Sequence, residues 1–371
     1  MKKMLVSDSS EGDLLKKNTR RSTIVCGPFL ITSVVAASLA IAIISSTHLL
    51  ASAPIDAVEY WCRLPRPTLF EDEEDELAAN ERLTNGERLL EDQIYGPESI
   101  AINKNTGLVY TGLRTGLICE IDLSGEPKII RALRLTSHEN CDGSYHSMPK
   151  CGRPLGMRFH PQTDELLVLD AYLGLFSIKW DTEEVRQLFA GTAPTSDDDS
   201  TPPTRYLNDF DFLPDGRLII SESSTKFDDR DFIYDLLEHR PNGRILEYNL
   251  ARDKLSVLVT NLYFPNGVQV VQGKVLIAEM GNARILKQVN LTTNMHFNQH
   301  LLSSQFVQAI AGWMTSKYGL ILKIDPESGR LLEAFHDRTG HISEVSVAVE
   351  NGRGNLLMGS DVQCYIGRIK L

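Results

Sequence analysis

Three oxygen-bearing side chains occupy the same position in a short motif that recurs along this chain. Glu98, Asn208 and Asn266 are each the third of five residues in stretches that read Gly-Pro-Glu-Ser-Ile, Tyr-Leu-Asn-Asp-Phe and Phe-Pro-Asn-Gly-Val. Calcium binds six to eight oxygen atoms from carboxylates, amides, backbone carbonyls and water. If the motifs surround a symmetry axis, the three side chains form a calcium site in a central channel. The alternative is that they solvate a water-filled channel and cap strand ends.

Hydrolysis at such a site also requires a general base within hydrogen-bond reach of the attacking water. Asp209 follows Asn208 in the chain and is our candidate for a catalytic carboxylate, the alternative being a structural carboxylate that faces inward. His160 precedes a proline, which is typical of a turn at a strand end. His146 lies in a polar loop, where an exposed side chain is the default. The chain contains no Gly-x-Ser-x-Gly nucleophile elbow and no Gly-rich phosphate-binding loop.

The elements that must position these residues are short strands. Each motif opens an alternation of apolar and polar residues, and most continue through a Pro/Asp/Gly-type turn into a second alternation, as in residues 210–220. Four strands per unit, at a period of roughly fifty residues, predict an all-β fold of the β-propeller type. A β-sandwich would not show this similarity between units.

The spacing of the motifs bears on the number of blades. Their third residues fall at 98, 155, 208 and 266, with Leu155 in the second copy, and the next recognisable copy has Ser343 at this position. The last step, 77 residues, is too long for one unit and too short for two. Either the propeller has five blades and an insertion, or it has six blades, one of which has lost its opening strands. We expect the six-bladed form.

The cysteines indicate an oxidising compartment. Cys141 and Cys151 bracket a polar loop, which predicts a local disulfide. No cysteine pair has zinc-type spacing with histidines. Cys26 lies in an apolar segment, which leaves an odd number of cysteines outside it and therefore at least one unpaired thiol. Asn290 begins the only Asn-x-Ser/Thr sequon, and we expect it to be glycosylated.

An apolar segment near the amino terminus is long enough to cross a bilayer. Residues 23–46 contain no charged residue, and lysines and arginines precede this segment whereas acidic residues follow it. A cleaved signal peptide normally has a shorter apolar core nearer the start. Because positive charge stays on the cytoplasmic side, we expect a cytoplasmic tail (1–22), a transmembrane anchor (23–46), a stalk (47–94) and a propeller domain (95–371). The protein would be a single-pass type II membrane protein with a lumenal or extracellular propeller.

The charge balance excludes nucleic acid as a partner. The 371 residues carry a net charge of −11, whereas nucleic-acid binding is dominated by the neutralisation of phosphates. An acidic surface suits solubility, divalent cations or an uncharged partner.

From residue 94 to the carboxyl terminus the sequence resembles the strictosidine synthase-like family. The motifs that carry the resemblance occur in family order and include residues 96–100, 151–156, 207–209, 221–227 and 264–268. The resemblance implies a six-bladed propeller on one amino-terminal anchor, with a disulfide at the position of Cys141 and Cys151. It also implies a relationship to gluconolactonases, paraoxonases and diisopropylfluorophosphatase. In those propellers a channel calcium ion, held by a Glu and by Asn or Asp residues, polarises an ester, lactone or phosphoester oxygen.

One unit departs from the family pattern. Family members usually carry a Phe-Pro-Asp-Asn-like motif that supplies an acidic ligand, and residues 286–318 replace it with unlike sequence. Glu98 is then the only formal charge among the candidate ligands, so we expect weak calcium binding. The favoured function is metal-assisted hydrolysis of a small hydrophobic aryl ester or lactone. The alternatives are a non-catalytic propeller that binds a partner or a lipid-like ligand, and amine–aldehyde condensation as in strictosidine synthase.

Overall fold

The computed structural model describes residues 37–41, 80–196, 201–288 and 318–371. The chain divides into two compact units, Met1–Pro54 and Ile55–Leu371. In the first unit only the helical residues 37–41 are described. None of the described helices has the length and apolar character needed to span a membrane. Most of the predicted anchor, and Asn290, lie outside the described residues.

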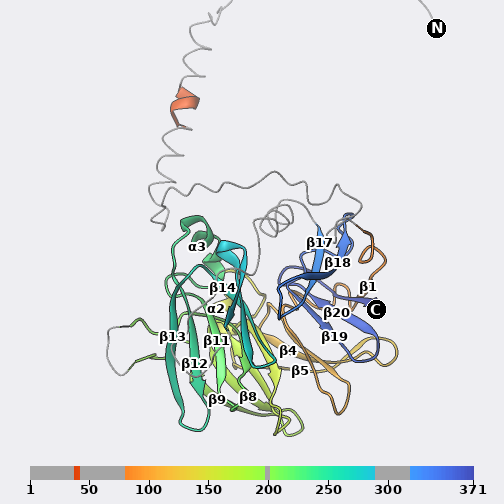
Figure 1. Cartoon of the computed structure of the whole chain (residues 1–371), viewed down its shortest axis with the longest axis horizontal. Helices are drawn as coiled ribbons and strands as arrows, with labels where there is room; N and C mark the ends of the chain where they lie inside the picture. The colour runs from red at the N-terminus through yellow and green to blue at the C-terminus, as the bar shows by residue number, and fades with distance from the viewer. Residues whose placement is uncertain (1–36, 42–79, 197–200, 289–317) are drawn as a thin grey trace, which may run out of the picture. The chain divides into compact units, whose positions relative to one another are not determined.

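The described part of the second unit forms six antiparallel sheets (Figure 1). The first contains, in spatial order, β2 (Ile100–Ile102), β3 (Val109–Gly112), β4 (Leu117–Asp122) and β5 (Lys128–Arg134). The second contains β6 (Pro154–Phe159), β7 (Leu166–Asp170), β8 (Gly174–Lys179) and β9 (Glu184–Ala190). The third contains β10 (Tyr206–Phe212), β11 (Leu218–Ser224), β12 (Gly243–Asn249) and β13 (Lys254–Leu262).

The remaining three sheets differ in their strand number. One has three described strands, β14 (Pro265–Val271), β15 (Lys274–Glu279) and β16 (Arg284–Gln288). The next has two, β17 (Gly319–Ile324) and β18 (Leu331–Asp337). The last has four, in the order β1 (Glu87–Leu89), β21 (Ile366–Lys370), β20 (Asn355–Gly359) and β19 (Val347–Glu350).

These sheets are arranged as the blades of an all-β propeller. The first strand of each blade contacts the first strand of the next, in the series β19, β2, β6, β10 and β14. Five sheets with three or four strands are therefore blades around a common axis, and the propeller prediction is confirmed. The predicted six blades are not confirmed, because β17 and β18 form only a two-stranded sheet in the described part of the chain and residues 289–317 lie outside it.

The core consists of layers between neighbouring blades. One cluster joins Leu167 and Leu175 of the second blade to Phe210, Ile220 and Leu246 of the third. Because both faces of an inner blade are covered, its middle strands are buried throughout, as all seven residues of β11 are. The sequence of such a strand is a continuous run of apolar or small residues rather than an alternation of apolar and polar residues.

The propeller begins earlier in the chain than we predicted. Residues 80–94, assigned to the stalk from sequence, contribute β1, which pairs with β21 at the outer edge of the last blade. Leu83 is fully buried, and its N–H donates to the carbonyl oxygen of His336 at 3.0 Å. A strand from the amino-terminal side therefore completes the last blade.

Connections on one side of the propeller carry short helices. The link between β11 and β12 contains η1 (Asp229–Asp231) and α3 (Phe232–Glu238), and η2 (Met280–Asn282) follows β15. The link between β5 and β6 contains α2 (Met148–Cys151) and the disulfide between Cys141 and Cys151. The predicted disulfide is thus confirmed, and Cys119 and Cys364 are free.

Candidate functional site

The inner strands of three blades are bulged at the same motif position. One extra residue interrupts the register of β10 with β11 around Asn208 and Asp209. β14 has the same interruption around Asn266, and β6 has one around Leu155. A bulge takes a side chain out of the regular alternation of its strand and re-aims it. The motif copies are therefore equivalent in structure, and β10 and β14 lie side by side with their bulges.

Glu98 precedes the inner strand of the first blade and lies among other carboxylates. Burial raises the pKa of Glu98 to about 8, Arg153 opposes this, and the charges of Asp209, Asp361 and Asp229 add to it. The side chain of Glu98 makes no hydrogen bond to any described residue. The carboxyl of Glu98 is therefore mostly protonated at neutral pH, and a cation close by would stabilise its charged form.

Arg153 is a buried cation whose charge acts on Glu98 without a direct contact. It is 1% exposed, and its guanidinium donates to the carbonyl oxygen of Gly96 at 2.8 Å and to that of Asp361 at 3.4 Å. It therefore joins the second blade to the first and the last. Because its hydrogen bonds go to backbone oxygens, Arg153 leaves the carboxyl of Glu98 without a direct ion pair in the described structure.

The two asparagines supply neutral oxygens without protein partners. Asn208 is only 3% exposed, and its amide makes no hydrogen bond to any residue that the structure describes. Asn266 is partly exposed, and its side chain likewise has no partner within the described ranges. Most buried polar side chains are hydrogen-bonded, because burial without a partner is costly. The amide of Asn208 is not among the fully buried, unpaired side-chain atoms of the described residues, so it reaches solvent and is available to bind water or an ion.

Asp209 is held on one of its two carboxylate oxygens. Its Oδ2 accepts from the backbone N–H of Val268 at 3.0 Å and from Arg158 at 3.3 Å. Its Oδ1 makes no hydrogen bond to a described residue. Asp209 thus ties β10 to β14 and to β6, as the structural alternative for this residue requires, and keeps one oxygen for a water molecule.

Arg158 and Asp211 extend the network along the same strands, and sequence reasoning missed both. Arg158 lies 4.0 Å from Oδ1 of Asp211, whose Oδ2 accepts from the N–H of Val270 at 2.7 Å. The carboxylates of Asp209 and Asp211 oppose the burial of Arg158, and its guanidinium pKa lies above the ordinary value. The signal in the sequence was the period of two between Asp209 and Asp211, which places both on one face of β10.

The two histidines considered from sequence make no hydrogen bond to a candidate site residue in the described structure. Nδ1 of His160 accepts from the backbone N–H groups of Gln162 and Thr163 at 3.2 and 3.3 Å, as expected for a turn at a strand end. His146 is exposed and packs its ring against Tyr145.

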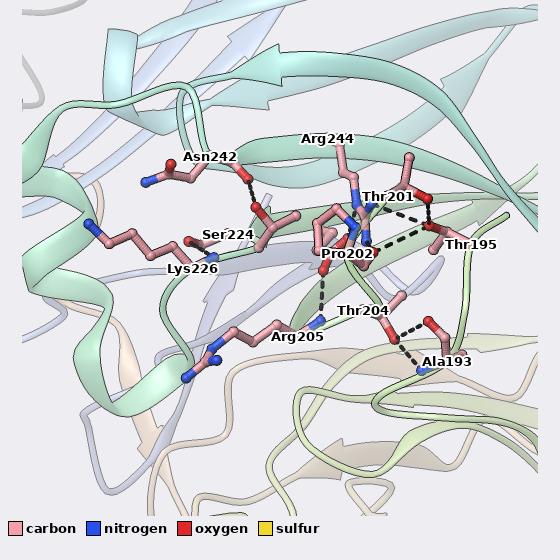
Figure 2. Close-up of polar contacts among 12 residues, drawn as sticks. Ala193, Thr195, Thr201, Pro202, Thr204, Arg205, Ser224, Lys226, Asn242 and Arg244 are labelled. Atoms are coloured by element: carbon pink, nitrogen blue, oxygen red, sulfur yellow. Dashed lines mark hydrogen bonds and ion pairs between the residues drawn. The ribbon is translucent and has the colours of Figure 1, made fainter. Parts of the chain in front are cut away.

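The most distinctive sequence motif, residues 221–224, supplies the carboxylate of a buried ion pair rather than a reactive group. Figure 2 shows the cation of this pair, Arg244, beside Thr195 and Pro202. Nε of Arg244 donates to Oε2 of Glu222 at 2.5 Å, and neither residue is more than 3% exposed. Arg244 also donates to Thr195 at 3.3 Å and to the carbonyl oxygen of Pro202 at 2.9 Å. Glu222 accepts in addition from the N–H of Arg205 at 2.7 Å. The pair anchors the connection between the second and third blades.

The donor set suits a hard cation better than a transition metal. Within the described ranges there is no cluster of three or more His, Cys, Asp or Glu side chains with metal-binding geometry. Glu98, Asn208 and Asn266 offer one carboxylate and two amides, which are oxygen donors of the kind that calcium takes. The amide of Asn208 reaches solvent, and the carboxyl of Glu98 has no hydrogen-bond partner among the described residues, so both are available to such an ion.

Comparison with known proteins supports the resemblance to the strictosidine synthase-like family. Residues 208–292 match the family model described as strictosidine synthase, and residues 75–121 match the strictosidine synthase-like amino-terminal model. The adipocyte plasma membrane-associated protein of Danio rerio is 37% identical over 344 residues, which cover 79% of each chain. The chain belongs to the strictosidine synthase-like family, in the branch of the adipocyte plasma membrane-associated proteins. The Rattus norvegicus protein of this branch is 35% identical and covers 91% of this chain and 98% of its own.

Solved structures agree with the fold of this family member. A putative gluconolactonase superposes with a TM-score of 0.51 and 15% identity, covering 77% of this chain and 92% of its own. A gluconolactonase from Xanthomonas campestris gives a TM-score of 0.51 and 12% identity, covering 78% and 91%. At these identities the likeness shows a shared propeller fold.

The raised pKa of Glu98 predicts a pH dependence of stability for this family member. Between the ordinary value of 4.5 and about 8, the folded protein holds a proton that the unfolded chain has lost. Without calcium, stability should therefore fall as pH rises through this range, by up to about 1.4 kcal/mol per pH unit from this group. Urea unfolding at pH 6 and pH 8 in the presence of a chelator measures the slope. The Glu98→Gln variant should lack this contribution, and equal slopes in both proteins would contradict the assignment.

Proposed function

We propose that this protein is a calcium-dependent hydrolase of aryl esters or lactones, with its active site in the propeller channel. The observation that carries the proposal is the amide of Asn208, which is 3% exposed, lies in an inner-strand bulge and has no partner within the described structure. A cation that takes amide oxygens would satisfy it. The bulge of the neighbouring strand brings Asn266 to the equivalent position.

The chain's own residues have separate roles in this activity. Glu98 would supply the negative charge of the calcium site, and Asn208 and Asn266 its neutral oxygens. When bound, calcium supplies Lewis-acid polarisation of an ester or lactone oxygen. Asp209 would orient the attacking water through Oδ1, because Oδ2 is already engaged by Val268 and Arg158. The gluconolactonase fold of the similar structures supports the choice of lactones as a substrate class.

We also propose a sixth blade and attachment to a membrane. β17 and β18 would be the third and fourth strands of a sixth blade. Residues 23–46 would anchor the protein as a single-pass type II membrane protein with the propeller in the lumen or outside the cell. The names of the relatives, as plasma membrane-associated proteins, support membrane attachment. In that compartment Asn290 would carry a glycan.

A specific observation also favours a second candidate, a non-catalytic propeller that binds a lipid-like ligand. α3 packs Phe232 and Leu236 on a cluster whose buried members include Leu155, Tyr206 and Phe264, which lie at or next to the starts of β6, β10 and β14. The same helix leaves Ile233 and Leu237 42% and 61% exposed. Nearby, Tyr145 of the disulfide loop is 49% exposed, and its hydroxyl donates to Asp231 at 3.0 Å. An apolar surface of this kind suits contact with a hydrophobic partner.

Calcium titration of the full chain with two readouts separates the candidates. We expect calcium at 100 times its dissociation constant to stabilise the fold by about 2.7 kcal/mol and to be required for hydrolysis of phenyl acetate. Dihydrocoumarin serves as the lactone probe under the same conditions. If calcium changes neither readout, and any hydrolysis survives the Glu98→Gln substitution, the enzyme hypothesis is wrong and the binding function is favoured.

A further inference from the structure

One buried hydroxyl joins the two bulges that carry the candidate asparagine ligands. Ser221 lies on β11, the second strand of the third blade, and is fully buried. Its Oγ accepts from the backbone N–H of Asp209 at 3.0 Å and donates to the carbonyl oxygen of Asn266 at 2.5 Å. The carbonyl oxygen of Asp209, at 3.2 Å, is the more distant acceptor for the single hydroxyl proton. Ser221 therefore links the backbone of Asp209, which follows Asn208, to the backbone of Asn266.

A second hydroxyl on the same face of β11 reinforces the link. Ser223 is fully buried, and its Oγ donates to the carbonyl oxygen of Pro265 at 2.8 Å. Residues two apart in a strand point to the same side, so Ser221 and Ser223 hold two consecutive carbonyls of the β14 bulge. Bulge residues lack regular ladder hydrogen bonds, and these hydroxyls replace them.

We infer that Ser221 is a positioning residue for the proposed calcium site. Its two hydrogen bonds set the spacing between Asn208 and Asn266 across the two blades. This inference rests on the proposed function. Substitution of residues that orient metal ligands typically lowers metal affinity by about 10- to 100-fold. Ser221 touches neither candidate side chain, so its effect would act only through the backbone of the bulges.

The same strand offers a matched control in Ser224 (Figure 2). Ser224 is also fully buried, and its Oγ donates to Asp235 at 2.8 Å and accepts from the N–H groups of Lys226 and Phe227 at 3.1 and 3.0 Å. These partners belong to α3 and to the link that leads to it, not to the bulges. Ser224→Ala therefore removes a comparable buried hydroxyl that makes no hydrogen bond to β10 or β14.

The experiment measures the calcium dissociation constant by isothermal titration and the melting temperature without calcium, for the full chain and its variants. We expect Ser221→Ala to raise the dissociation constant by at least about tenfold, and Ser223→Ala by about threefold. Ser224→Ala should lower the melting temperature by a similar amount but leave the dissociation constant within about twofold.

The outcomes distinguish the role of Ser221 from the proposed function. If the unmodified chain binds calcium and Ser221→Ala binds it equally well, the role of Ser221 is wrong while the proposed function stands. Equal losses of affinity in Ser221→Ala and Ser224→Ala would also overturn the role, because the effect would then be general destabilisation. Should Ser221→Ala fail to fold, unchanged affinity in Ser223→Ala overturns it. Absence of calcium binding in the unmodified chain overturns both proposals.

Discussion

Replacing Glu98 with Gln should weaken calcium binding by at least about 100-fold, which corresponds to about 2.7 kcal/mol of binding free energy. Glu98 is the only formal charge among the three candidate ligands, and the other two are neutral amides. Calcium affinity follows the number of charged ligands in the site. Gln keeps the shape of the side chain and one of its oxygens, so the loss reports the charge rather than a gap in packing.

The same substitution should leave the ion-free protein folded. Since the pKa of Glu98 is raised to about 8, the carboxyl is mostly neutral at pH 7 without calcium, and Gln resembles that neutral form. Asp211→Asn is the matched control. It removes a carboxylate that lies on β10 and is not a candidate calcium ligand. We expect it to change the calcium dissociation constant by less than about threefold. A similar loss of affinity in both variants would show that the summed negative charge of the channel carboxylates attracts the ion, rather than direct binding by Glu98.

Replacing Arg244 with Ala should cost about 3–5 kcal/mol of unfolding free energy, the largest stability effect that we expect from one substitution. The variant leaves the carboxylate of Glu222 buried without its cation and also removes the hydrogen bonds to Thr195 and Pro202. Burial already raises the pKa of Glu222 despite the opposing charge of Arg244. Urea unfolding monitored by tryptophan fluorescence gives the difference in free energy.

Two further proteins test the cause of that loss. Arg252 is exposed, and Arg252→Ala should change stability by less than about 0.5 kcal/mol. The double variant Glu222→Gln/Arg244→Met removes both charges and should recover part of the loss, because the main cost is the unpaired carboxylate. If the double variant is no more stable than Arg244→Ala, the loss comes from the broken hydrogen bonds of Arg244 to Thr195 and Pro202 instead.

The repeated motif was enough to predict the architecture because each copy is a local pattern. The apolar alternation and the turns predicted the strands, and the third motif position predicted which inner-strand residues share one structural environment, including Leu155. β1 was not predictable in this way. Residues 87–89 form a strand only because they pair with residues 366–368 at the far end of the chain, and three residues carry no periodic signal.

The candidate site shows the same division between local and long-range information. The residue types and register of Glu98, Asn208 and Asn266 were visible in the sequence. The hydrogen bond of Ser221 to Asn266, 45 residues away, and the ion pair of Arg158 with Asp209, 51 residues away, depend on how neighbouring blades pack. The raised pKa of Glu98 likewise arises from burial and from carboxylates on other blades, which no single stretch of sequence displays.

We propose that calcium binds in the propeller channel through Glu98, Asn208 and Asn266. Isothermal titration of calcium into the chelator-treated full chain at pH 8, in parallel with its Glu98→Gln variant, tests it most directly. We predict one saturable site per chain, with a dissociation constant that rises by at least about 100-fold in the variant. No saturable binding at millimolar calcium, or equal binding by the two proteins, would contradict the claim.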